Sequence, residues 1–156
     1  IKSWLEIFEN YYLLFRISPW THKISRAIKK DKKLYLFDYA QISNTGARFE
    51  NMIALELYRA ILNWNVLGWG DFSLNYIRNK EKEEVDFLIC ENHQPILLIE
   101  CKLSDENISN SLIKFQNKLN VPAIQLVNKK HVGRIITNQK NKVLITSAPR
   151  WLSFLP

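Results

Sequence analysis

Two neighbouring apolar segments near the middle of the chain each carry acidic residues. Residues 84–90 read EVDFLIC, and residues 96–102 read ILLIECK, in which an apolar run ends in Glu100 and Lys102. Carboxylates can bind a divalent cation, and a cation with a nearby lysine can activate water. This chemistry requires that Asp86, on the first segment, lies beside Glu100 on the second.

We expect the two segments to pair as an antiparallel hairpin around residues 91–95. Because side chains alternate along a strand, this register puts Asp86 opposite Glu100 and Glu84 opposite Lys102. The same register pairs Leu88 with Leu98 and Cys90 with Ile96. Two like charges about 5 Å apart repel by roughly 3 kcal/mol at an effective dielectric of about 20. A partly buried pair must therefore be neutralised by a shared proton, by Lys102 or by a bound divalent cation.

The segments around this hairpin predict alternating helices and strands. Residues 46–63 carry apolar side chains at helical spacing, behind the N-cap candidates Ser43, Asn44 and Thr45. Strands are expected at 72–78, 84–90, 96–102, 121–127 and 142–148, a second helix within 104–120 with Ser104 and Asp105 as caps, and a short last helix from Pro149. From residue 46 onward the order is helix, three strands, helix, strand. This order predicts an α/β fold with a central sheet flanked by helices.

Two glutamates of the helix at 46–63 are oriented toward the body of the protein. Glu50 projects from the flank of the apolar face, and Glu56 also falls in the apolar stripe. Position alone does not decide which of them joins the acidic pair.

The N-terminal residues are predicted to be an extension of the main domain. We assign residues 1–33 to a helix and basic linker at the end of a preceding domain, and residues 34–156 to the main domain. Apolar residues at helical spacing indicate a helix over at least part of 1–16, and a short strand is expected at 34–38.

A basic arm, KISRAIKKDKK, occupies residues 23–33. It either contacts phosphates or forms a solvated connector. The residues expected to contact nucleic acid are Lys29, Lys30, Lys32, Lys33 and Arg78. The triplet from Asp31 to Lys33 repeats the acid-x-lysine pattern of Glu100 and Lys102, and we interpret it as a chance match.

The composition suits one globular domain. The chain has 156 residues, 47% of them hydrophobic, and a net charge of +7, which fits a polyanion partner such as DNA. No stretch reaches the roughly 18 apolar residues of a membrane helix and no signal peptide is visible, so a cytoplasmic protein without membrane association is expected. The two cysteines, Cys90 and Cys101, are too few for a zinc site, and we expect reduced thiols.

Glu50 on the helix, Asp86 on the second strand and Glu100-Cys101-Lys102 on the third together resemble the PD-(D/E)XK nuclease superfamily, whose core runs αβββαβ. More narrowly, nearly the whole chain resembles the nuclease-like C-terminal domain of unknown function that follows an AAA-type ATPase domain in many bacterial and archaeal proteins. The similar stretches are residues 33–38, 46–50, 76–78, 84–87 and 99–102. The resemblance implies a restriction-endonuclease-like core, with a mixed central sheet, behind an N-terminal helical and basic extension.

The resemblance also implies a DNA endo- or exonuclease that depends on Mg²⁺ or Mn²⁺. Asp86 and Glu100 would ligate the metal with the carbonyl oxygen of Cys101 and with Glu50, and Lys102 would orient the attacking water. Auxiliary roles fall to Gln116 and Glu84. The implied partners are DNA and an N-terminal AAA-type ATPase domain of the same full-length protein. Association of the chain with a second copy of itself stays open.

Three alternatives stay open at this point. The domain could be a catalytically silent nuclease fold that binds DNA or regulates the attached ATPase, because fold resemblance does not establish catalysis. It could also be a protein-interaction domain whose aromatic residues build a core and a dimer face. Finally, Glu100 and Lys102 could form a plain ion pair on an edge strand.

Overall fold

The computed structural model describes residues 2–21, 31–104, 107–138 and 141–156. The described strands are β1 (Leu14–Pro19), β2 (Lys33–Leu36), β3 (Phe72–Arg78), β4 (Glu84–Glu91), β5 (Gln94–Lys102), β6 (Ala123–Val127), β7 (Gly133–Asn138) and β8 (Asn141–Ser147). The described helices are α1 (Lys2–Asn10), α3 (Thr45–Val66), α4 (Asn110–Leu119) and α5 (Ala148–Leu152), with a 3-10 turn η1 (Tyr39–Gln41). These elements confirm the expected α/β class.

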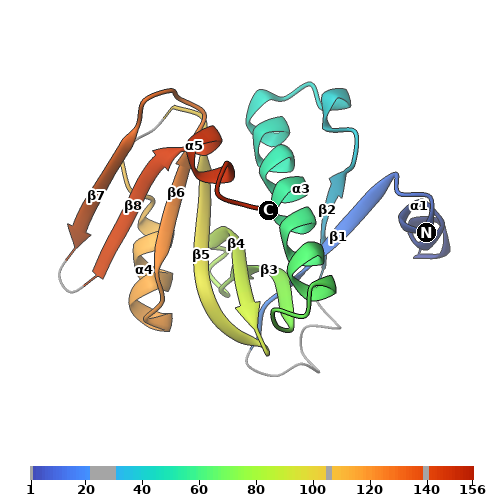
Figure 1. Cartoon of the computed structure of the whole chain (residues 1–156), viewed down its shortest axis with the longest axis horizontal. Coiled ribbons are helices and arrows are strands. Elements are labelled where there is room, and N and C mark those ends of the chain that lie inside the picture. Colours follow the sequence, from blue (N-terminus) through green and yellow to red (C-terminus); the bar gives the residue numbers. More distant parts are fainter. Residues whose placement is uncertain (1, 22–30, 105–106, 139–140) are drawn as a thin grey trace.

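One mixed sheet of eight strands runs through the described residues in the order β2-β1-β3-β4-β5-β6-β8-β7 (Figure 1). Strands β4 and β5 are antiparallel neighbours, as the predicted hairpin requires, and β3 is antiparallel to β4. Strands β5, β6 and β8 are parallel. Helices flank the sheet, with α3 and α4 on opposite sides (Figure 1). The expected mixed central sheet flanked by helices is therefore confirmed.

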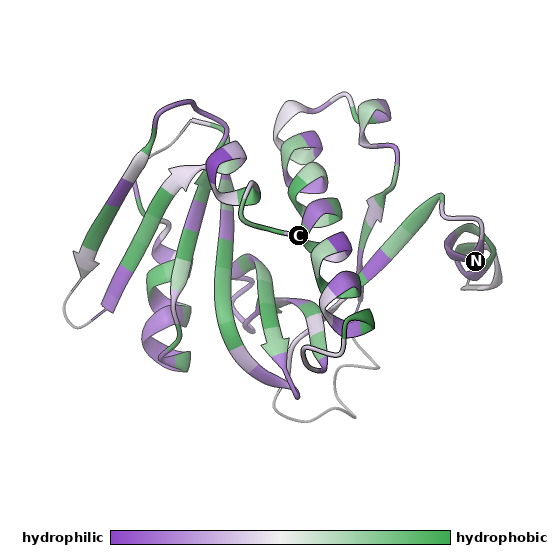
Figure 2. Ribbon diagram, in the orientation of Figure 1, coloured by the Kyte–Doolittle hydropathy of each residue, from purple (hydrophilic) through white to green (hydrophobic). Residues whose placement is uncertain are grey.

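The two faces of the sheet carry separate apolar clusters, and hydrophobic residues lie along β4 and the middle of β5 (Figure 2). Phe87 and Ile99 pack with α3, whereas Leu88 and Leu98 pack with α4. Because β4 and β5 are covered on both faces, their side chains are apolar in succession rather than in alternation. This double covering explains the uninterrupted run ILLI that precedes Glu100.

The two predicted helices that flank the sheet, at 46–63 and within 104–120, form with shifted bounds. Asn44 caps α3 by accepting a 2.9 Å hydrogen bond from the backbone N–H of Ala47, and the helix continues to Val66, three residues past the prediction. Helix α4 begins only at Asn110, with Ser109 rather than Ser104 at the N-cap position. The other cap candidate, Asp105, lies outside the described residues.

The hairpin between β4 and β5 is tighter than the predicted loop of five residues. Asn92 and His93 both have positive φ, which the two central residues of a tight hairpin turn require. A bulge between Ile89 and Cys90 then pairs Cys90 with Pro95, so its predicted pairing with Ile96 is wrong. Beyond the bulge, Leu88 pairs with Leu98, as predicted.

The N-terminal segment contributes a strand that the hydrophobic pattern did not indicate. Helix α1 confirms a helix within residues 1–16, but it ends at Asn10, and Phe15 lies in β1 instead. The backbone reverses near Tyr12, which has a φ of 55°. Strand β1 then pairs with both β2 and β3 and so belongs to the same sheet as the site.

In the described parts of the chain, no helix combines the length and the apolar character needed to cross a bilayer.

Candidate functional site

The sheet divides where the acidic residues lie. The β4–β5 ladder reaches Phe87–Ile99 and has no further paired position. Past this point β4 continues beside β3 and β5 continues beside β6. Asp86 and Glu100 are the next residues on each strand, so they sit at the fork. Asp86 and Glu100 therefore lie directly after the last pair of the ladder, but the predicted pairing between them is not part of the ladder.

A side chain replaces the missing ladder bond at the fork. The backbone N–H of Cys101 donates a 2.9 Å hydrogen bond to Oδ2 of Asp86. This contact fixes one carboxylate oxygen of Asp86 against the backbone of β5. The other oxygen, Oδ1, lies 3.5 Å from Nζ of Lys33.

Glu100 is the most buried acid of the group, with 5% of the residue exposed. Its Oε1 lies 3.1 Å from Nζ of Lys102, whose side chain is 37% exposed. Its Oε2 is buried and has no hydrogen-bond partner among the described residues. A buried carboxylate oxygen without a partner carries a desolvation cost of a few kcal/mol, so it is a group that a bound cation would stabilise.

Lys33 stands between the remaining carboxylates. Its Nζ lies 2.6 Å from Oε1 of Glu84, 3.1 Å from Oε1 of Glu50 and 3.5 Å from Oδ1 of Asp86. The acids come from α3 and β4, and the lysine comes from the first residue of β2. The predicted site residues Glu50, Glu84 and Asp86 are therefore brought together, around a lysine that sequence reasoning had assigned to phosphate contacts.

Tyr35 is a second site residue that sequence reasoning missed. It lies two residues after Lys33 on β2, so both side chains share one face of the strand. Its hydroxyl donates a 2.7 Å hydrogen bond to Oε1 of Glu50. The alternation of side chains in KLYL could have predicted that Lys33 and Tyr35 lie on the same face of the strand. It could not have predicted that α3 packs against that face.

Burial and mutual repulsion dominate the electrostatics of the acidic cluster, which consists of Glu50, Glu84, Asp86 and Glu100. Burial, followed by the charges of Glu100 and Glu50, raises the pKa of Asp86 to about 7, although Lys33 and the Cys101 N–H act in the opposite direction. Burial lowers the pKa of Lys33, but the charges of Asp86, Glu50 and Glu84 outweigh this effect and hold the pKa above its ordinary range. The cluster is short of positive charge even with Lys33 in place.

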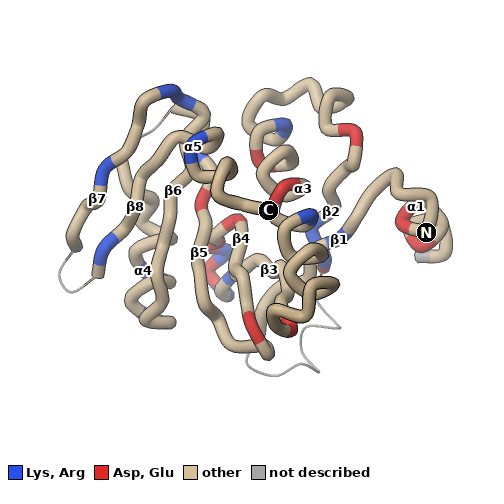
Figure 3. The backbone as a smooth tube through the Cα atoms, viewed as in Figure 1, with Lys and Arg blue, Asp and Glu red and all other residues tan. Residues whose placement is uncertain are grey.

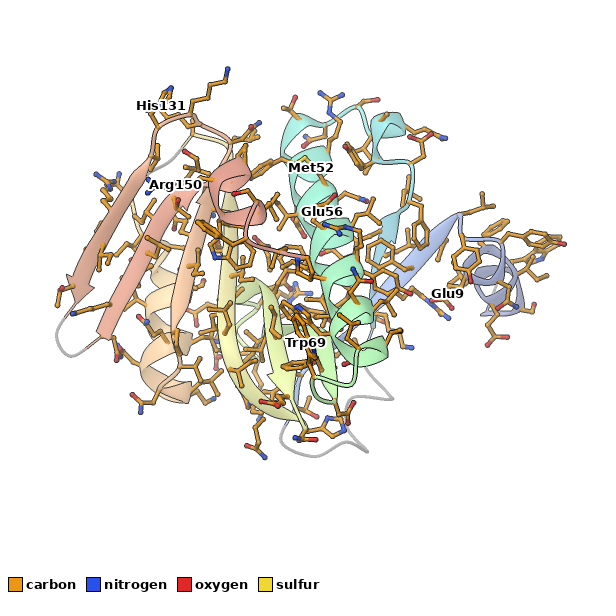
Figure 4. The ribbon with its side chains drawn as sticks, viewed as in Figure 1. Glu9, Met52, Glu56, Trp69, His131 and Arg150 are labelled. Carbon is orange, nitrogen blue, oxygen red and sulfur yellow. The ribbon has the colours of Figure 1, made fainter. Side chains whose placement is uncertain are left out.

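The other predicted residues lie around or outside this cluster. Arg78 Nε lies 3.5 Å from Oε2 of Glu84, and Lys32 is exposed. Glu56, labelled on α3 in Figure 4, pairs with Arg59 and not with the cluster, which resolves the choice between the two glutamates. Gln116 is buried on α4 and donates to the backbone carbonyl of Lys142 on β8. Lys29 and Lys30 lie outside the described residues.

Gln125 is a further buried polar residue next to the site. It pairs with Glu100 in the parallel β5–β6 ladder and is fully buried. Its side chain donates to the carbonyl of Asn107 and accepts from the backbone N–H of Ser109. Gln125 thereby ties the segment before α4 to the strand beside Glu100.

The donor chemistry of the cluster fits a hard divalent cation. Its oxygens are carboxylate oxygens, and Oε2 of Glu100 is buried and unpartnered. In the arrangement observed, however, no group of three or more His, Cys, Asp and Glu side chains within the described ranges is placed to hold a metal ion. Lys33 occupies the space between Glu50 and Asp86.

Fold and site together define a mixed α/β domain with a partly buried acidic cluster at a fork of its sheet. The chain belongs to the family described as "Domain of unknown function (DUF4143)", which matches residues 45–148. No curated protein shows significant sequence similarity to the chain. Among solved structures, a chain in the assembly of Thermococcus gammatolerans McrB AAA+ hexamers with bound McrC is similar, with a TM-score of 0.49 and 10% identity. The match covers 67% of this chain, which spans only 28% of that one.

Proposed function

We propose that this domain is a metal-dependent deoxyribonuclease of the PD-(D/E)XK type that cleaves phosphodiester bonds with Mg²⁺ or Mn²⁺. The order α3, β3-β4-β5, α4, β6 supports a restriction-endonuclease-like core. The observation that carries the proposal is the buried, unpartnered Oε2 of Glu100 at a fork that it shares with Asp86. Buried polar atoms in native proteins usually have a hydrogen-bond partner, so we place the bound cation at this oxygen.

Each residue of the cluster has a role in this proposal. Asp86 and Glu100 would hold the cation together with Glu50 and the carbonyl oxygen of Cys101. The cation would polarise the scissile phosphate and lower the pKa of a water molecule. Lys102, half-exposed beside Glu100, would orient the attacking water and stabilise the negative charge that develops on the phosphate oxygens.

The charge distribution supports nucleic acid as the partner. Residues 107–156 contain eight lysines and arginines and neither aspartate nor glutamate, whereas residues 1–106 contain all 15 acids of the chain. Blue positions in Figure 3 mark β7, β8, α5 and the connection between β6 and β7. This basic part of the molecule adjoins the acidic fork through the ladder of β5 with β6. Attachment to an AAA-type ATPase, which the family resemblance implies, would supply the motor for movement along DNA.

DNA cleavage with Mg²⁺ and then with Mn²⁺, on single- and double-stranded substrates, tests the proposal. Asp86→Ala should reduce the cleavage rate by at least about 100-fold, because it removes a metal ligand and leaves Glu100 alone at the fork. Asp71→Ala, an exposed acid outside the cluster, is the matched control. Cleavage that is equal in wild type and Asp86→Ala would contradict the proposal.

A second candidate function is a catalytically silent module that binds DNA or regulates the attached ATPase. The observation that favours it is Lys33, which already satisfies three of the four carboxylates. DNA that shifts in a gel but stays intact with both metals would support the silent module.

A further inference from the structure

Lys33 has the contacts of an internal counter-cation. An ammonium group has three N–H donors, and the three carboxylates of Glu50, Glu84 and Asp86 surround it. Only 21% of the Lys33 side chain is exposed, so these contacts are partly shielded from water. The lysine therefore joins β2, α3 and β4 at the point where the three acids would otherwise repel one another.

The charges of the cluster show what Lys33 replaces. Glu50, Glu84, Asp86 and Glu100 carry four negative charges when ionised. Among the ion pairs of the described residues, Lys102 pairs with Glu100, Arg78 lies near Glu84, and Lys33 contacts both Glu50 and Asp86. A divalent ion bound to Glu50 and Asp86 would face the ammonium at close range, and the two positive charges would repel each other strongly in a partly buried site.

We propose that Lys33 closes the acidic cluster to divalent metal, so that the metal binds only when the ammonium leaves Asp86 and Glu50. This inference rests on the proposed metal site and adds a competition for that site within the chain itself. Lys33 and the metal are alternative cations for the same oxygens, and the cluster changes between a lysine-filled and a metal-filled state.

Glu84 offers Lys33 a place to stay during this exchange. The Lys33–Glu84 contact, at 2.6 Å, is the shortest of the three, and the longest is the 3.5 Å contact with Asp86. The flexible stem of a lysine allows the ammonium to retain Glu84 while it leaves the other two acids. Glu84 thus acts through Lys33 as a positioning residue.

Isothermal titration calorimetry with MnCl₂, on protein without DNA, tests the competition. Lys33→Met should bind Mn²⁺ at least about tenfold more tightly than wild type, because the competing charge is gone while the stem is kept. Lys32→Met, an exposed neighbour, is the matched control and should bind like wild type. If Lys33→Met does not fold, Lys33→Gln serves instead, since its amide donates to carboxylates without a charge.

A double-mutant cycle tests the role of Glu84. Glu84→Gln should weaken Mn²⁺ binding in the wild-type background, because Lys33 then remains on Asp86 and Glu50. The same change should have little effect in the Lys33→Met background, where no ammonium needs a second position. An equal loss in both backgrounds would mean that Glu84 ligates the metal directly, which overturns this part of the inference.

The outcomes separate the inference from the proposed nuclease function. Tighter binding by Lys33→Met without DNA cleavage by any variant supports the competition and contradicts the nuclease. Equal binding by wild type and Lys33→Met, lost in Asp86→Ala, keeps the metal site and overturns the competition. Absence of Mn²⁺ binding in wild type, Lys33→Met and Lys33→Gln alike overturns both.

Discussion

Asp86 carries an electrostatic cost that depends on pH. Its pKa is raised to about 7 in the folded protein, first by burial and then by Glu100 and Glu50, against about 3.9 in an unfolded chain. Between these values the unfolded chain releases the proton and the folded chain keeps it. The contribution of Asp86 to stability is therefore fully present below about pH 4 and is lost as the pH rises through about 7.

Replacing Asp86 by asparagine should remove this pH dependence. We expect the free energy of unfolding of Asp86→Asn, relative to wild type, to rise by roughly 2–3 kcal/mol between pH 4.5 and 8 in metal-free buffer. Urea denaturation across this range measures the difference. The exposed Asp71→Asn is the control and should run parallel to wild type. A constant difference between Asp86→Asn and wild type would contradict the burial of an ionisable Asp86.

Among the elements, those with regular hydrophobic spacing were predictable and those set by local backbone geometry were not. The alternation along the two segments was enough to predict that Leu88 pairs with Leu98, but the pairing of Asp86 with Glu100 predicted from the same register is not part of the ladder. The bulge at Cys90 depends on a tight turn whose two central residues, Asn92 and His93, have positive φ. Neither residue is followed by glycine, so the sequence lacks the asparagine-glycine signal from which such a turn is predicted.

Long-range packing explains the other misses. Strand β7 lacks a regular alternation of apolar and polar residues, and β1 ends in Pro19, so the sequence alone does not predict either segment as a strand. The role of Lys33 depends on β2 lying across α3. The sequence places the lysine at the end of a basic arm, where exposure to solvent is the ordinary expectation.

Asn51 is the residue that holds β2 across α3. It is 2% exposed, and its side chain accepts from the backbone N–H of Leu36 (2.8 Å) and donates to the carbonyl of the same residue (2.7 Å). Asn51→Ala leaves both backbone groups without these partners, so we expect a loss of roughly 2–4 kcal/mol in the free energy of unfolding. Chemical denaturation measures the loss.

The control for this element-scale prediction is Asn63→Ala, on the exposed side of the same helix, which should change stability by less than about 0.5 kcal/mol. Because Asn51 bonds the backbone of the strand that carries Lys33, the variant should bind Mn²⁺ differently from wild type even under conditions where it stays folded. Equal stability of the Asn51 and Asn63 variants would show that the paired hydrogen bonds do not anchor β2.

At the scale of the whole molecule, acidic and basic residues are separated along the chain. The net charge of +7 fits a polyanion partner, and the sequence predicts nucleic-acid contacts at the N-terminal arm and Arg78. In the structure Lys33, Arg78 and Lys114 face carboxylates, whereas β7, β8 and α5 carry basic residues and no acids. Figure 4 places Arg150 on α5 and His131 before β7. The separation of acidic and basic residues along the chain could be predicted from the sequence. The position of the basic part beside the fork depends on the order of strands in the sheet, which the sequence did not give.

A groove on this basic side gives the last prediction. It has a volume of about 460 Å³, between β7, β8 and α5, and its lining includes Arg134, Arg150, Trp151 and Phe154. The arginines can contact phosphates, and Phe154, 80% exposed, can stack on a base.

The double variant Arg134→Glu/Arg150→Glu should weaken binding to single-stranded DNA and lower the slope of log K against log salt by about 1–2, since each lost phosphate contact removes roughly 0.7. Fluorescence anisotropy at several salt concentrations measures the slope. The control is Lys82→Glu, an exposed charge reversal outside the basic C-terminal part, and a double variant that matches this control would mean that DNA does not pass over the groove.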